Sequence, residues 1–176
     1  MRRYALFIFF FTTYLSAKAQ DSTFVKKLAD KLAKATFSGD TKTVVNLTYP
    51  ELVKLSGGKE AMQKLITERT EALKSRGVLK FDGWVNQPGP FYTAGNQVHC
   101  LVPETVVMFV FNGRYISHSY LLGVSDDQGK TWTFLDVGNM PGNVLKRLLP
   151  NFNPNLQIPP PTKPTFFPDS APQIGG

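Results

Sequence analysis

The chain has 176 residues, 42% of them hydrophobic, and its 20 lysines and arginines against 13 acidic residues give a net charge of +7. This length accommodates one domain with a sizeable core and a short additional segment. The basic residues are spread along the sequence, with no run longer than Lys26–Lys27, whereas nucleic-acid binders gather them on one face. Nucleic acid is therefore not an expected partner, and the single cysteine, Cys100, excludes an internal disulfide bond.

Residues 1–19 have the three parts of a signal peptide. Arg2 and Arg3 form a positive start, an apolar run follows from Tyr4 to Leu15, and Ala17-Lys18-Ala19 supplies small residues for cleavage. The run is shorter than the about 20 residues that a membrane-spanning helix needs. We therefore expect export to the periplasm or the extracellular space, with no transmembrane segment in the mature chain; an uncleaved anchor is the alternative. The mature chain would keep 17 basic and 13 acidic residues, a net charge of +4.

Apolar residues at helical spacing predict three helices before any strand. They cover residues 21–38, 41–55 and 59–76. Asp21 or Ser22 can cap the first helix by accepting a bond from a free backbone amide, and Gly39 is suited to end it. Pro50 bends or restarts the second helix, and Gly77 ends the third.

From Val78 onward, apolar residues alternate with polar ones, which is typical of strands. Pro103 is expected to interrupt the longest strand, because proline has no amide hydrogen for the ladder. Asn112-Gly113 predicts a type I′ hairpin turn, whose two central residues need positive φ. The expected strands cover residues 78–86, 91–94, 97–111, 114–125 and 131–137, and a short closing helix covers residues 142–149.

Helices first and antiparallel strands afterwards predict an α+β fold, with three N-terminal helices packed on a curved, mostly antiparallel sheet. This domain would cover residues 20–149. The Pro-rich C-terminal tail, residues 150–176, holds eight of the 13 prolines and favours an extended conformation. We expect its first part to lie along the body and its last dozen residues to be disordered.

The segment Ser125–Trp132, SDDQGKTW, fits the pattern S-x-D-x-G-x-T-W, the Asp-box that recurs in the propeller blades of sialidases. A propeller repeats a blade of about 40 residues several times, and this chain has one copy of the pattern. Asp127 can fold its carboxylate onto backbone amides of a turn, and Gly129 can adopt positive φ. We therefore interpret the segment as a β-hairpin that binds neither metal nor sugar.

The layout is similar to that of the NTF2-like (cystatin-like) superfamily, whose members fold as an α+β cone. The similarity rests on FSGDTKTVVNLTYPELV after the first helix, on the long strand broken at Pro103, and on the closing hairpin SYLLGVSDDQGKTWTFLDV. It covers about residues 21–149 and resembles small exported bacterial members without an assigned activity. The resemblance implies either a protein that binds a ligand or partner, or an isomerase or dehydratase with Asp, His or Tyr inside the cone.

Four polar residues are candidates for a site inside such a cone: His118, Asp136, Asp82 and Tyr120. A carboxylate base with a tyrosine or carboxylic acid donor is the arrangement of ketosteroid-isomerase-like sites. The alternative for His118, which lies on an apolar strand face, is a core histidine bonded to a neighbouring hydroxyl or carbonyl group. His99 and Cys100 are adjacent on a strand and would point to opposite faces, which argues against a nucleophile–base pair.

The sequence contains no metal-binding or cofactor-binding motif, so no metal and no cofactor is expected. These features favour a non-catalytic module of the cell envelope that binds a small apolar ligand or an envelope protein. Val106–Phe111, VVMFVF, is apolar on both faces of its strand, which makes a homodimer through the sheet a further expectation. The alternative function is a cofactor-free isomerase or lyase, which needs an open cavity in which at least two of the four candidate residues converge.

Overall fold

The computed structural model describes residues 15–138, 140–160 and 162–169, so most of the expected signal peptide lies outside the described residues. Four helices precede the strands: α1 (Leu15–Ser38), α2 (Thr41–Leu47), α3 (Pro50–Leu55) and α4 (Lys59–Ser75). The elements that follow are β1 (Lys80–Val85), β2 (Tyr92–Ala94), β3 (Gln97–Val110), β4 (Gly113–Ser125), β5 (Thr133–Asp136), α5 (Gly142–Leu148) and β6 (Thr165–Pro168).

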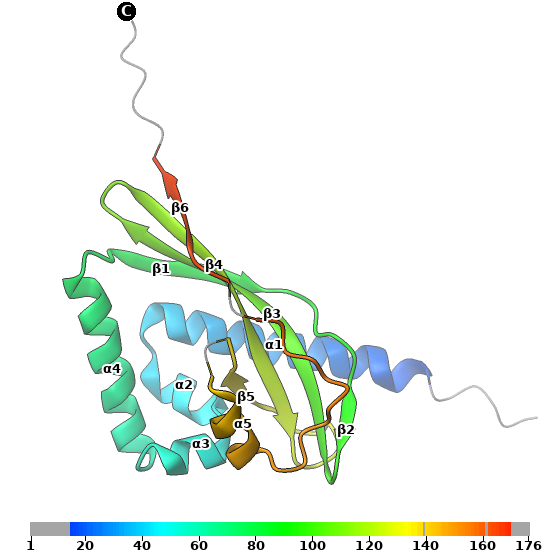
Figure 1. The fold of residues 1–176 in the computed structure, drawn as a ribbon. Helices are drawn as coiled ribbons and strands as arrows, with labels where there is room; N and C mark the ends of the chain where they lie inside the picture. Colours follow the sequence, from blue (N-terminus) through cyan, green and yellow to red (C-terminus); the bar gives the residue numbers. More distant parts are fainter. Residues whose placement is uncertain (1–14, 139, 161, 170–176) are drawn as a thin grey trace, which may run out of the picture.

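The long hairpin of β3 and β4 is the centre of the sheet, and its pairing runs from Val98 opposite Ser125 to Val110 opposite Gly113. Strands β1 and β2 follow one another along the free side of β3, and β5 and β6 share the free side of β4. All of these pairs are antiparallel, and the sheet is strongly curled (Figure 1). The fold is therefore α+β, with several helices on a curled antiparallel sheet.

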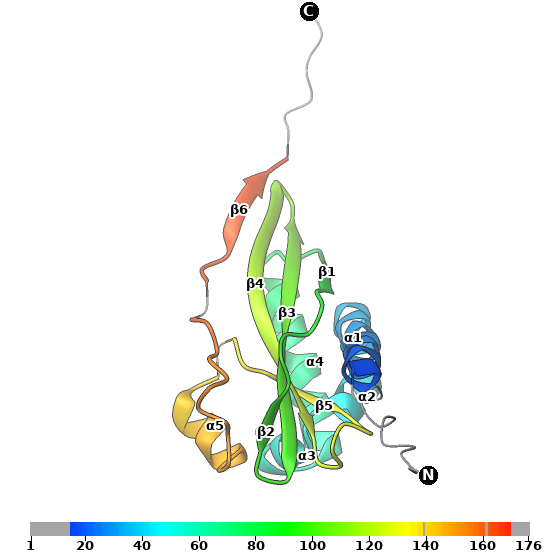
Figure 2. The ribbon, with the colours of Figure 1, turned by 90° about the vertical axis from the view of Figure 1, so that its right-hand side faces the viewer.

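The two faces of the sheet are covered by different parts of the chain (Figure 2). On the face toward α1 and α2, which we call the inner face, Val25, Ala29 and Leu32 of α1 share a core with Val102 and Phe134. On the opposite, outer face, α5 and the first part of the tail form a second core with β4 and β5. Its fully or nearly fully buried members include Leu122, Val124, Leu135, Leu148, Leu149 and Leu156.

The helix ends partly follow the sequence signals. Gly39 has φ +79°, as expected of a residue that ends a helix, and Pro50 restarts the second expected helix as α3. The expectation that Asp21 or Ser22 caps the first helix is wrong, because α1 already begins at Leu15. This helix therefore runs through the expected cleavage position.

Two expectations for the strands are also wrong. Strand β3 continues through Pro103, whose carbonyl oxygen accepts a bond from the Asn86 amide at 2.8 Å on the side where β1 ends. The proline nitrogen faces the same side, beyond the end of β1, so the missing amide hydrogen breaks no strand pairing. The central turn lies one residue earlier than expected, because Val110 pairs with Gly113 and leaves Phe111 and Asn112 as its two central residues. Neither has the positive φ of a type I′ turn, since Gln128 is the only described non-glycine residue with positive φ.

The tail is more ordered than the sequence indicates. Leu156 is buried in the outer core, as expected for the first part of the tail. However, Thr165–Pro168, which we expected to be disordered, forms β6 on the edge of β4. Within the described part of the chain, none of the helices combines the length and apolar character needed to cross a membrane.

Candidate functional site

The Asp-box segment is a hairpin turn in which the motif residues bond to one another. The Ser125 hydroxyl donates to Asp127 at 2.9 Å and accepts from the Gly129 amide at 2.8 Å. The Asp127 carboxylate also accepts from the amides of Lys130 and Thr131, at 3.0 and 2.8 Å. These hydrogen bonds lower the pKa of Asp127 to about 2, the bonds from Thr131 contributing most. The interpretation of this segment as a hairpin is therefore confirmed.

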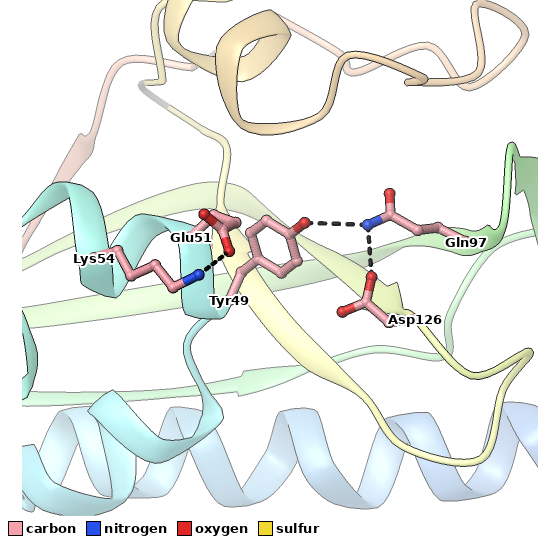
Figure 3. Close-up of polar contacts among 5 residues, drawn as sticks. All are labelled: Tyr49, Glu51, Lys54, Gln97 and Asp126. Carbon is pink, nitrogen blue, oxygen red and sulfur yellow. Dashed lines mark hydrogen bonds and ion pairs between the residues drawn. The ribbon is translucent and has the colours of Figure 1, made fainter.

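A polar network on the outer face connects α3, β3 and the start of this turn (Figure 3). The Gln97 amide nitrogen donates to the Tyr49 hydroxyl at 3.1 Å and to Asp126 Oδ1 at 2.6 Å. Burial raises the pKa of Tyr49, so its hydroxyl stays neutral. The ion pair of Glu51 with Lys54, at 2.6 Å, lies on the other side of Tyr49 in the same view. The network fixes elements in place and offers no free nucleophile.

His99 extends this network into the outer core. Its Nε2 is 3.0 Å from Gln97 Oε1, and its ring stacks on Phe152 of the tail with 5.8 Å between ring centres. Because the Gln97 amide nitrogen already donates twice, Oε1 is the acceptor, and Nε2 of His99 carries the proton. Nδ1 is then a bare acceptor, buried without a hydrogen-bond partner among the described residues. Burial lowers the pKa of His99, so the ring is neutral at pH 7.

The inner face carries a second polar group, formed by two carboxyl side chains on either side of Ser119. Glu104 lies directly opposite Ser119 in the register of β3 and β4. The Ser119 hydroxyl donates to Asp136 Oδ1 at 3.1 Å, and the Gly138 amide donates to the same oxygen at 3.0 Å. Asp136 is thus held in place by two donors, while Glu104 has no hydrogen bond to any side chain in the described part of the chain.

Glu104 is 8% exposed, and burial, followed by the nearby charge of Asp136, raises its pKa to about 7. A carboxyl group that is partly protonated at neutral pH, beside a second carboxylate, is the kind of group that acid–base chemistry uses. Glu104 was not among the residues predicted from the sequence. The signal that could have found it was an acid between Val102 and Val106 on one strand face, in the stretch VPETVV.

The structure separates the four residues that the sequence proposed for a site. His118 and Tyr120 lie on the outer face of β4, and His118 Nδ1 is 3.2 Å from the Thr105 hydroxyl. Asp82 is exposed on the same face at the edge strand β1, where the Gly83 amide and Lys80 lower its pKa. Asp136 alone lies on the inner face. Among the described residues, no hydrogen bond joins any two of the four.

Cys100 and His99 point to opposite faces, as expected. Cys100 is buried in the core beneath α1, and burial raises the pKa of its thiol to about 12. A thiol with this pKa is not a nucleophile at neutral pH. Among the residues that the structure describes, no three His, Cys, Asp or Glu side chains are placed to hold a metal ion.

The end of the sheet farthest from α5, which we call the distal end, exposes a group of aromatic side chains. The distal end consists of Lys80–Gly83, Val106–Ser117 and Thr165–Pro168 (Figure 1). Phe111 at the turn is 92% exposed, and Tyr115, Phe166 and Phe167 are between 37% and 41% exposed. Leu79 lies beside this end and is 65% exposed. Monomeric proteins usually bury such clusters unless they serve an interaction.

Two hollows lie along the tail on the outer face. One, of about 240 Å³, lies between the segment after β1 and Leu156, with Tyr92 and Leu101 in its wall. The other, of about 420 Å³, lies between α5 and the prolines of the tail, and Val137, Met140, Leu145 and Ile158 are among its lining residues. Neither hollow is lined by a charged side chain.

Comparison of the chain with protein-family models, with curated proteins and with solved structures found no match.

Proposed function

We propose that this chain is a non-catalytic binding module exported to the cell envelope, and that it binds a protein partner with the distal end of its sheet. The observation that carries the proposal is the gathering of exposed aromatic side chains at this end, Phe111, Tyr115, Phe166 and Phe167. Aromatic residues are enriched in the centres of protein interfaces. An NTF2-like arrangement of helices on a cone-shaped sheet, which we propose for residues 20–149, is compatible with such a role.

The distribution of these residues favours a protein over a membrane surface or a small ligand. By the strand register, Tyr115 and Phe166 lie on the inner face, and Phe167 lies on the outer face. A flat lipid surface could cover only one of these faces. The outer backbone edges of β1 and β6 have no strand partner in the described part of the chain, and such edges suit an extended polypeptide.

Photo-crosslinking in the producing cells tests this proposal. A photoreactive phenylalanine analogue at Phe111 should form a discrete protein adduct, because this side chain is 92% exposed at the proposed interface. The same analogue at Lys34, exposed on α1, is the matched control and should form none. Equal labelling at both positions, or no adduct at Phe111, would refute the binding surface. A bound small molecule in the native mass spectrum would favour a small-ligand function instead.

A second function, a cofactor-free isomerase or lyase, is favoured by one specific observation. Glu104 is buried on the inner face without a hydrogen bond from a described side chain, and its pKa is about 7. A base in this range can remove a proton from carbon at neutral pH, and Asp136, fixed by Ser119, would tune it through its charge. The sequence suggested His118, Asp136, Asp82 and Tyr120 as candidates, and of these the pair proposed here keeps Asp136 alone.

Proton exchange tests this second function with a panel of generic substrates. Small enolisable ketones in D2O should exchange their α-protons faster with the protein than without it, and Glu104→Gln should abolish the increase. Glu68→Gln, at an exposed position of α4, is the matched control and should retain it. If the parent protein gives no increase for any ketone of the panel, the enzymatic function is not supported and the binding function stands alone.

A further inference from the structure

Strand β6 completes two rows of side chains that cross the distal end of the sheet. On the outer face, the register aligns Lys80, Phe109, Arg114 and Phe167. Lys80 Nζ lies 5.2 Å from the centre of the Phe109 ring, and the guanidinium carbon of Arg114 lies 5.9 Å from that of Phe167. On the inner face, the next row ends in Tyr115 and Phe166, with ring centres 5.0 Å apart. The edge of β4 therefore fits an extended segment with two consecutive aromatic residues.

The backbone of β4 is also adapted to this segment. Gly113 has φ +155°, and a Cβ atom there would collide with the carbonyl oxygen of Phe167 and approach the Cα of Pro168 to 2.9 Å. Only glycine permits this approach of the two backbones. Just beyond the strand, the Asp169 amide donates to the Asn112 carbonyl oxygen at 3.1 Å. The backbone of β4 at Gly113 is therefore adapted to close contact with β6.

The same segment remains exposed on the surface of its own chain. All four residues of β6 are exposed, and β4 is its one strand partner among the described residues. The linker from the buried Leu156 to Thr165 contains Pro159, Pro160 and Pro164, and prolines favour an extended chain without internal hydrogen bonds. At roughly 3.1 Å per residue, a linker of this length spans at most roughly 28 Å, which limits how far β6 can move from the buried Leu156.

We propose that β6 is an exchangeable strand, and that two copies of this chain dimerise by each placing Thr165–Pro168 on the β4 edge of the other. The contacts in the dimer are those already made within one chain, which makes strand exchange a low-cost route to association. Phe111 lies in the turn between β3 and β4, next to the end of the exchanged strand, and we expect it to lose exposure in the dimer. This inference rests on the proposed function of the distal end and names its partner as a second copy.

Cysteine crosslinking between two different single variants tests the exchange. Tyr115→Cys in one chain and Phe166→Cys in the other place thiols at directly opposite positions, which can be joined only when β6 has crossed to the other molecule. The native Cys100 is fully buried and does not compete. We expect a crosslinked heterodimer whose yield rises with protein concentration. Phe166→Cys mixed with Lys34→Cys, exposed on α1, is the control and should give none.

A second pair, Arg114→Cys with Phe167→Cys, repeats the test on the other sheet face and preserves the contact of Tyr115 with Phe166. The double variant Tyr115→Cys/Phe166→Cys measures the closed form, because it can form the bond within one chain. An internal bond at every concentration, with no heterodimer from either mixed pair, would overturn the exchange. If adducts with another protein still formed at Phe111, the binding function would survive while the second copy would be excluded as partner.

Discussion

The carboxylate of Asp127 accepts hydrogen bonds from both the backbone amide and the side-chain hydroxyl of Thr131, at 2.8 and 2.7 Å. The adjacent Ser125 hydroxyl bonds to the same carboxylate and to the Gly129 amide. The hydrogen-bonding groups that define the Asp-box are thus directed into the turn itself. The motif specifies a tight connection between two strands, here in a fold that is not a propeller.

Replacement of Asp127 should therefore lower stability without any loss of ligand binding. Asp127→Ala removes the carboxylate that accepts hydrogen bonds from Ser125, Lys130 and Thr131, and it should reduce the melting temperature by several degrees. Asp127→Asn keeps one oxygen and should reduce it less. Because the folded-state pKa is about 2, against an ordinary 3.8, the stabilisation is present above about pH 4 and disappears as the pH falls toward 2. Thermal unfolding followed at pH 7 and pH 2.5 checks both statements. Specific calcium or sialic acid binding that is lost in the alanine variant would contradict them.

Gln97 is the central residue of the network on the outer face, because it contacts Tyr49, Asp126 and His99. Gln97→Leu leaves the buried Tyr49 and His99, and the exposed Asp126, without this partner. We expect a loss of about 2–3 kcal/mol in the free energy of unfolding, since each neutral hydrogen bond contributes about 1 kcal/mol and an unpaired group costs more. Urea denaturation measures it, with the exposed Gln87→Leu as control. Equal stability of the two variants would show that the network contributes nothing.

The α+β class, the order of most elements and the Asp-box hairpin could be predicted, because they depend on local periodicity and on turn residues. The interruption at Pro103 could not be judged from sequence. Whether a proline breaks a strand depends on which side its nitrogen faces, and that is fixed by where β1 ends. Gly113 was assigned to a turn, although its conformation instead allows close approach of β6 from more than fifty residues away.

The candidate site was predicted less well, for a related reason. The sequence shows which residues share the face of one strand, and it correctly placed His118 with Tyr120. It does not show which faces of different strands coincide, so Asp136 and Asp82 were grouped with His118 although Asp136 lies on the other side of the sheet. Glu104 became visible only when the register placed it beside Ser119 and Asp136.

His99 should make stability depend on pH in the neutral range. Its pKa is lowered in the folded protein, mainly by burial, while the unfolded chain has the ordinary value of 6.5. The unfolded state therefore binds a proton first, and the free energy of unfolding should fall as the pH decreases from about 7 to about 5. His99→Leu should remove this part of the pH dependence. Urea denaturation at several pH values across that range should show it as a smaller slope of the free energy of unfolding against pH. An unchanged slope would mean that the folded protein accommodates the charged ring, for instance through Asp126.

Glu104 should make stability depend on pH in the opposite direction from His99. Its pKa is raised from 4.5 to about 7 in the folded protein, so the folded state keeps a proton that the unfolded state has released. Its destabilising effect is absent below about pH 4.5, grows as the pH rises, and is complete above about pH 7. Between pH 4.5 and pH 7, this pKa shift lowers the free energy of unfolding by on the order of 3 kcal/mol.

Glu104→Gln removes this charge while keeping the size of the side chain. We expect the variant to resemble the parent at pH 4 and to be more stable than the parent at pH 8, with the difference increasing between these values in chemical denaturation. Glu68→Gln, on the exposed surface of α4, provides the matched control and should show no such trend. A constant difference at all pH values would mean that Glu104 titrates like an exposed carboxylate, and it would also remove the observation that favours acid–base chemistry on the inner face.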